Sequence, residues 1–381
     1  MKILNLRVFY IMAIIFINFG NNHAEAQQTI KIGFIGPSTG AASLLGLTAK
    51  EGFTMGVEDV NAKGGINGKR LDFIAYDSTS KPPVAATLAQ RLILEDKVPL
   101  INAGTGSLDV LAMMEVTERA KFPLFVSSSG SILITEKGYK WVWRVGTSDK
   151  TSAEGLGAYL DGKANWSRIA FLFENTDYGK PPSEVIIKML RETKGKEIAA
   201  VETYNRGDTD MSGQLWKIKN SNPHVLVTWG YYTEGALIAR QAKQIGLKAQ
   251  LIGNAATGIL EYIQLAGAAA EGVMHVNNIS NAINPDPAVQ AFGKRFEEKY
   301  HRSPGITGLD NYDGAHVIAE VLKKVGTDPI RIQNALNTMT FQGTAETIKF
   351  DAKGQAIRGV VFAKVEGGKF KFIEYFYPHE K

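Results

Sequence analysis

The chain of 381 residues contains no cysteine. This absence excludes disulfide bonds, thiol nucleophiles and metals held by thiolates. Whatever stabilises the fold must therefore be side-chain packing, for which a chain of this length with 44% hydrophobic residues has enough material.

The common enzyme motifs are also missing. None of the six histidines forms an H-E-x-x-H motif or a close pair with metal spacing, and no G-x-S-x-G elbow occurs. The segment Gly104-Thr105-Gly106 superficially suggests a dinucleotide fingerprint, but its sixth position is Asp109, whose charge would repel a pyrophosphate. We therefore expect a protein that is not an enzyme and that uses no cofactor and no metal.

Charge gives little support for nucleic-acid binding. The net charge is +5 with an isoelectric point near 9.0, and the basic residues are spread along the chain without interleaved aromatics. The composition instead indicates an ordinary solvated surface, and no nucleic-acid partner is expected.

The first 26 residues have the pattern of a secretory signal peptide. Lys2 and Arg7 precede an apolar run at 8–19, and the cleavage motif AEA follows at 24–26. The run is shorter than the ~20 residues that span a bilayer. Because Gln27 and not cysteine follows the predicted cut, no lipid anchor is expected, and the sequence favours a protein that diffuses freely in the periplasm.

Two α/β lobes are predicted from a repeated order of elements. The apolar runs TIKIGFIG at 29–36 and SRIAFLFEN at 167–175 each precede an amphipathic, helix-length stretch. Helical stretches near 286–300 and 310–325 should return to the first lobe, and the tail should form a hairpin around Gly367-Gly368. Further strands are predicted at 70–77, 98–104 and 122–128 in the first lobe, and at 197–204, 223–230, 249–254 and 271–277 in the second.

The expected fold class is thus α/β, with two Rossmann-like lobes joined by a hinge of three crossovers near 145, 277 and 352. The signal peptide occupies 1–26. Lobe one comprises 27–145 plus 278–351, and lobe two comprises 146–277 plus 352–381.

The loops that follow the predicted strands are small and polar. In open α/β sheets a ligand binds outside the carboxyl ends of the strands, so these loops are candidates for a site. Serine and glycine at helix N-termini suit a carboxylate or another anion, although each loop alone can equally be an ordinary helix cap. The loops lie at 37–40, 103–107 and 127–131 in lobe one, and at 177–179, 230–232 and 253–258 in lobe two.

Several motifs in combination resemble one family. PSTG, VEDVNAKGGING, the pair DYG and GDTD, and GYYTEGALIARQAKQIGLK are similar to segments of the leucine/isoleucine/valine-binding proteins of ABC importers, over about residues 29–375. The resemblance implies a type I periplasmic binding protein that closes on an amino acid or related small carboxylate and delivers it to an ABC permease in the inner membrane. A monomer is expected.

The resemblance also implies particular site residues. Ser107 would hydrogen-bond the ligand carboxylate, and Ser128 or Ser129 would offer a backbone N–H. Tyr178 and Tyr231 would be lids from lobe two. At two further positions the residue differs from the one usual in the family. Either Gly130 or Ser131 stands where the family usually has threonine, and Leu45 stands where an aromatic residue often lines the pocket.

One departure from the family affects the choice of ligand. Ala255 occupies the position of the glutamate that pairs with the ligand ammonium. An unpaired buried ammonium costs several kcal/mol. Either Asp310 or Asp313 pairs with the ligand ammonium in place of the glutamate, or the ligand is a carboxylate without an amino group. Two other functions stay open: a ligand-sensing subunit of a membrane receptor with the same fold, and a secreted hydrolase.

Overall fold

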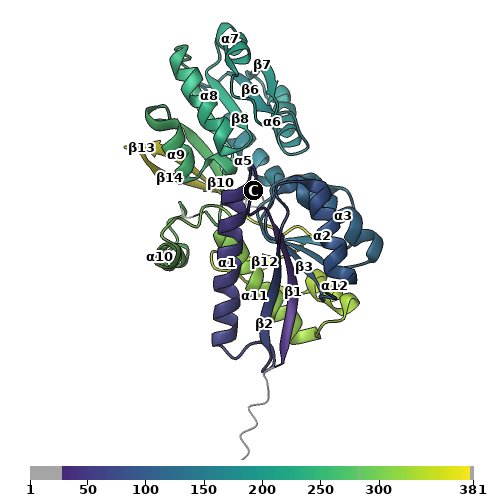
Figure 1. Cartoon of the computed structure of the whole chain (residues 1–381). Helices are drawn as coiled ribbons and strands as arrows, with labels where there is room; N and C mark the ends of the chain where they lie inside the picture. The colour runs from purple at the N-terminus through teal and green to yellow at the C-terminus, as the bar shows by residue number, and fades with distance from the viewer. Residues whose placement is uncertain (1–27, 282, 378–381) are drawn as a thin grey trace, which may run out of the picture.

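The computed structural model describes residues 28–281 and 283–377, so the predicted signal peptide lies outside the described residues. These residues form two lobes, each built on a twisted sheet flanked by helices (Figure 1). The predicted fold class is confirmed.

The first sheet has the strand order β2-β1-β3-β4-β5, and every pair in it is parallel. Helices connect successive strands, as parallel pairing requires. The last strand, β5, was not predicted, although β3 and β4, which are equally short, lie within predicted strands. The elements are β1 (Thr29–Gly36), α1 (Ser43–Ala62), β2 (Arg70–Asp77), α2 (Pro82–Leu94), β3 (Ile101–Ala103), α3 (Ser107–Ala120), β4 (Leu124–Val126), α4 (Leu133–Glu136) and β5 (Val142–Arg144).

The second sheet has the order β14-β13-β10-β9-β8-β6-β7. Its first five strands along the chain pair in parallel, and the last two are antiparallel. The predicted hairpin is confirmed, with Gly367 and Gly368 both at positive φ. The elements are α5 (Asp149–Asp161), β6 (Arg168–Glu174), α6 (Lys180–Glu192), β7 (Glu197–Tyr204), α7 (Ser212–Asn220), β8 (Val225–Trp229), α8 (Tyr232–Gln244), β9 (Gln250–Gly253), the 3₁₀ turns η1 (Ala255–Thr257) and η2 (Gly267–Ala269), α9 (Leu260–Ala266), β10 (Met274–Asn278), β13 (Val360–Glu366) and β14 (Lys369–Phe376).

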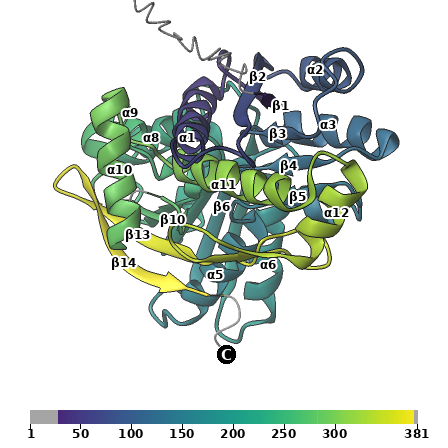
Figure 2. The same ribbon diagram turned by 90° about the horizontal axis from the view of Figure 1, so that it is seen from below.

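The segment between β10 and β13 returns to the first lobe, as predicted. Helix α11 packs closely along α1 (Figure 2). The approach depends on glycine, because a Cβ on Gly52 would lie only 1.9 Å from the carbonyl oxygen of Gly308. The elements are α10 (Pro287–Tyr300), α11 (Gly308–Val325), α12 (Pro329–Thr338), β11 (Thr340–Gln342) and β12 (Thr347–Lys349).

The chain passes between the lobes three times: from β5 to α5, from β10 to α10, and from β12 to β13. Buried Arg144 ties two of these passages together, since its Nε donates to Gln355 Oε1 at 2.6 Å. Three passages constrain how the lobes can move relative to each other. The residue boundaries assigned to the lobes stay a prediction.

Candidate ligand-binding site

A small cavity of about 30 Å³ lies between the lobes. It sits at the carboxyl ends of strands from both sheets, where ligands of open α/β sheets bind. Seven of the eight predicted site residues line it: Leu45, Ser107, Ser128, Ser129, Tyr178, Tyr231 and Ala255. The other lining residues are Thr105, Gly106, Gly130, Asp149, Ala256, Asn278 and Ile306.

On the lobe-one side, Ser107 is the first residue of α3, and Gly106 before it has a φ of 97° that favours glycine. The N–H of Ser131 donates to Ser107 Oγ at 3.2 Å. That bond joins the two predicted serine loops, while the Ser107 hydroxyl keeps its hydrogen for a second acceptor. Because the first N–H groups of a helix lack internal partners, this corner suits an anion.

In the second serine loop, residues 127–131, only one of the two backbone N–H groups expected to bind the ligand is a candidate. The N–H of Ser128 donates to the carbonyl of Gly104 at 3.1 Å, so it is not available to a ligand. Ser129 is the remaining candidate, and its buried Oγ has no hydrogen-bond partner among the described residues. Its carbonyl accepts from Arg144 Nη1 at 2.8 Å, which holds the loop in place.

The structure also resolves which residue of this loop faces the cavity. Gly130 lines it, whereas fully buried Ser131 does not, and the Ser131 Oγ donates to the carbonyl of Asp177 at 3.1 Å. The expected contact of Ser131 with a ligand stays a prediction. Ser131 forms a hydrogen bond from lobe one to lobe two.

Asp149 is a lining residue that the sequence analysis missed. It is the first residue of α5, directly after the passage from β5, and its side chain is buried. Burial raises the Asp149 pKa to about 7, while Arg144 and the indole N–H of Trp229 act in the opposite direction. No hydrogen bond to Oδ2 from the described residues has standard geometry. An aspartate next to Ser148 resembles an ordinary first-turn acid. The usable signal was its place after a strand, and that strand, β5, was not predicted.

On the lobe-two side, Tyr178 and Tyr231 form a tilted pair with ring centroids 5.1 Å apart. Tyr178 Oη accepts from Asn254 Nδ2 at 2.8 Å, and the guanidinium of Arg206 lies 4.6 Å from the Tyr231 ring centre. Burial raises the pKa of Tyr178 and raises that of Tyr231 to about 12, so both hydroxyls stay neutral near pH 7. Both can therefore act as donors.

The cavity is also closed by apolar contact between the lobes. Leu45 and Ile306 come from the lobe-one side, yet they belong to the same apolar cluster as the two tyrosines. Ala255 begins the turn after β9 and is buried there. None of these residues carries a carboxylate.

Neither aspartate suggested as a substitute for the missing glutamate lines the cavity. Asp310 and Asp313 face Arg358, with an oxygen of each 3.7 Å from a guanidinium nitrogen. Arg358 also donates to Glu346 Oε1 at 2.6 Å. Both aspartates belong to a buried ion network with Arg358.

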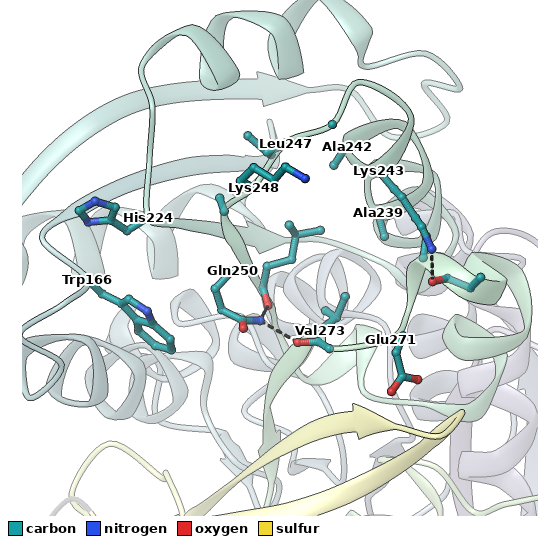
Figure 3. Close-up of a pocket in the computed structure, with 16 residues that line it drawn as sticks. Trp166, His224, Ala239, Ala242, Lys243, Leu247, Lys248, Gln250, Glu271 and Val273 are labelled. Atoms are coloured by element: carbon teal, nitrogen blue, oxygen red, sulfur yellow. Dashed lines mark hydrogen bonds between the residues drawn. The ribbon is translucent and has the colours of Figure 1, made fainter.

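A larger pocket of about 650 Å³ lies at the opposite, amino ends of the lobe-two strands (Figure 3). Polar groups in it are used by the protein itself. Lys243 Nζ donates to the carbonyl of Ala268 at 2.7 Å, and Gln250 Nε2 to that of Gly272 at 2.8 Å (Figure 3). Neither its position nor its chemistry makes it the candidate site.

Within residues 28–281 and 283–377, no group of three or more histidine, aspartate or glutamate side chains is arranged to hold a metal ion. In the same ranges, no helix combines the length and apolarity needed to cross a membrane. No histidine is among the residues that line the cavity.

Comparison with known proteins agrees with this geometry. The family model described as periplasmic binding protein matches residues 29–369. A leucine-, isoleucine-, valine-, threonine- and alanine-binding protein of Pseudomonas aeruginosa is 30% identical over 87% of this chain and 88% of its own length.

Two solved structures are similar over 92% of this chain and all of theirs. The leucine-binding protein LivK of Thermotoga maritima has a TM-score of 0.84 at 27% identity. LivJ of Streptococcus pneumoniae, solved in complex with isoleucine, has a TM-score of 0.83 at 26% identity. Since the match spans both lobes and the cavity between them, this chain belongs to the periplasmic binding proteins, in the family of the branched-chain amino acid binding proteins.

Proposed function

We propose that the protein is the solute-binding component of an ABC importer and that its lobes close on an amino acid or a related small carboxylate. The observation that supports the proposal is the small cavity between the lobes, which is lined by hydrogen-bond donors of one lobe and by two tyrosines of the other. Binding then requires both lobes, and the closed form reports that the ligand is present.

The ligand carboxylate docks on lobe one. The Ser107 hydroxyl, the N-terminus of α3 and the Ser129 loop together supply donors to an anion. The rest of the ligand lies against apolar side chains, chiefly Leu45 and Ile306 of lobe one. This arrangement suits a ligand with one anionic end and a modest apolar body.

The relatives support the same class of ligand. The Pseudomonas protein is named for the binding of five amino acids, and LivJ was solved with isoleucine. We further propose that the chain is exported by its signal peptide, acts in the periplasm as a monomer, and delivers its ligand to an inner-membrane permease without chemical change.

The test has two parts. Ligand released by denaturing the purified protein is identified by mass spectrometry, and its rebinding is measured by calorimetry. Vesicles that contain the cognate permease and ATPase are then assayed for ATP hydrolysis, which should rise with the liganded protein and not with the empty one. Stimulation of a receptor in place of a permease would favour the sensor function, and turnover of the ligand would favour the hydrolase.

A further inference from the structure

We propose that Asn254 is a positioning residue of the binding site. Its side-chain amide donates to the hydroxyl of Tyr178, so that the hydroxyl hydrogen is directed into the cavity and donates to the ligand. Asn254 joins β9 to η1, is fully buried and is not among the residues that line the cavity. It therefore acts through Tyr178, and its role rests on the function proposed above.

The first argument concerns the hydroxyl of Tyr178. Its Oη accepts a hydrogen bond from Asn254 Nδ2 at 2.8 Å. Within residues 28–281 and 283–377, the same hydroxyl donates to no acceptor. A buried hydroxyl can both donate and accept, and buried polar groups normally use what they can. Because Tyr178 lines the cavity, the missing acceptor is an atom of the ligand.

The second argument is that the direction of the Asn254 amide is fixed by its other end. Its Oδ1 accepts from the backbone N–H of Gly230 at 3.4 Å. The reversed amide would set Nδ2 against this N–H, and two donors would then face each other. The amino group of the amide therefore faces Tyr178. Since Gly230 precedes Tyr231 in the chain, Asn254 connects the segments that carry both tyrosines.

The third argument is that the turn holding Asn254 is itself anchored in the core of lobe two. Thr257 Oγ1 donates to the carbonyl of Asn254 at 2.7 Å and lies 2.9 Å from Nδ1 of His275. Because the threonine hydrogen is used on Asn254, the histidine nitrogen is the donor, which places the imidazole hydrogen on Nδ1. Burial lowers the pKa of His275 to about 3, so this support is neutral near pH 7. A positioning residue needs such a fixed base.

A purely structural role is the competing explanation, since a buried amide can stabilise a turn without any ligand. The two hydrogen bonds of the side chain differ, however: the bond to Gly230 is long at 3.4 Å, and the bond to Tyr178 is short at 2.8 Å. Tyr178 is also held by apolar packing and by its contact with the Tyr231 ring. The bond from Asn254 therefore mainly sets the direction of the hydroxyl.

The experiment is a double-mutant cycle, measured by titration calorimetry on the ligand-free mature protein with isoleucine and its 2-oxo acid as probes. Asn254→Asp keeps the size of the side chain but offers Tyr178 an acceptor, so the hydroxyl turns away from the ligand. Affinity should fall about tenfold or more, as it should in Tyr178→Phe. The variant with both changes should bind no more weakly than the weaker single variant, because both remove the same donor. Asn220→Asp, which adds the same charge at the exposed end of α7, is the control and should leave affinity unchanged.

Two outcomes overturn the role of Asn254 and leave the proposed function intact. One is wild-type affinity in Asn254→Asp. The other is a pair of single-variant losses that add fully in the double variant, since Asn254 would then act independently of Tyr178. A wild type that binds neither probe contradicts the proposed function itself, and the role of Asn254 with it.

A second variant covers the case in which Asn254→Asp does not fold. Asn254→Leu has a similar volume and removes the donor without adding a charge. It should weaken binding about twofold or more in the wild-type background, because the hydroxyl of Tyr178 loses its fixed direction, and should change nothing in the Tyr178→Phe background. Equal losses in the two backgrounds overturn the proposal, and so does unchanged affinity in Tyr178→Phe alone.

Discussion

The Asp149 carboxyl group packs directly against Gly130: a Cβ at position 130 would lie only 2.3 Å from Asp149 Oδ2. Gly130→Ala should therefore displace Asp149 from the cavity wall and lower the affinity for amino acids, measured by calorimetry. Gly213→Ala is the control, since nothing lies within 4 Å of a Cβ there. Unchanged affinity in Gly130→Ala would mean that the position of Asp149 is not needed for binding.

Ser107→Ala should weaken binding of the ligand carboxylate. A hydrogen bond to a charged group contributes roughly 1.5 to 3 kcal/mol, which corresponds to about ten- to a hundred-fold in affinity. Titration calorimetry measures the change. Ser212, the first residue of α7, has the same helical position far from the cavity, so Ser212→Ala is the control. Equal affinities in all three proteins would contradict the placement of the carboxylate.

Asp149→Asn should stabilise the empty protein at alkaline pH. Burial raises the Asp149 pKa from 3.8 to about 7, so its contribution to stability is fully present below pH 4 and is lost as the pH rises to 7. At pH 8 the free energy of unfolding of the variant should exceed that of the wild type by roughly 2 to 4 kcal/mol, and near pH 4 the difference should vanish. Urea unfolding at both pH values tests this. A variant less stable than the wild type at pH 8 would instead show that Asp149 mainly neutralises Arg144.

Arg358→Met should be strongly destabilising. The arginine is 2% exposed and faces the carboxylates of Asp310, Asp313 and Glu346, which would be left buried without a cation. Breaking such a network costs roughly 3 to 5 kcal/mol, whereas an exposed pair contributes about 0 to 1 kcal/mol. Denaturant unfolding should separate this variant from Lys217→Met, which removes an exposed pair with Glu202. A similar decrease in the free energy of unfolding of both variants would argue that the network is not needed for stability.

Ligand binding should compact the protein. The lobes meet through the Ser131 hydroxyl and the Asp177 carbonyl, and the chain passes between them three times. Small-angle scattering should show a smaller radius of gyration with ligand than without. Ser131→Ala should shift the equilibrium toward the open form and weaken binding about two- to tenfold, since a neutral hydrogen bond contributes roughly 0.5 to 1.5 kcal/mol. Identical scattering curves in both states would indicate a rigid module.

The sequence alone determined the two mainly parallel sheets and the loops at the carboxyl ends of their strands. Alternating short apolar runs and amphipathic stretches specify parallel sheets with helices on their faces, because parallel strands need a crossover between them. The carboxyl ends of such strands meet at one edge, so the loops holding Ser107, Tyr178 and Tyr231 could be assigned to a shared site before any coordinates were known.

Only the tertiary structure decided which carboxylate faces the cavity. Asp149, Asp310 and Asp313 are all aspartates in the first or second turn of a helix, and nothing local distinguishes them. Arg358, more than forty residues beyond Asp310 and Asp313, neutralises those two, while closure of the lobes leaves Asp149 against the ligand space. Electrostatic pairing depends on distance in space, and local sequence patterns do not encode that distance.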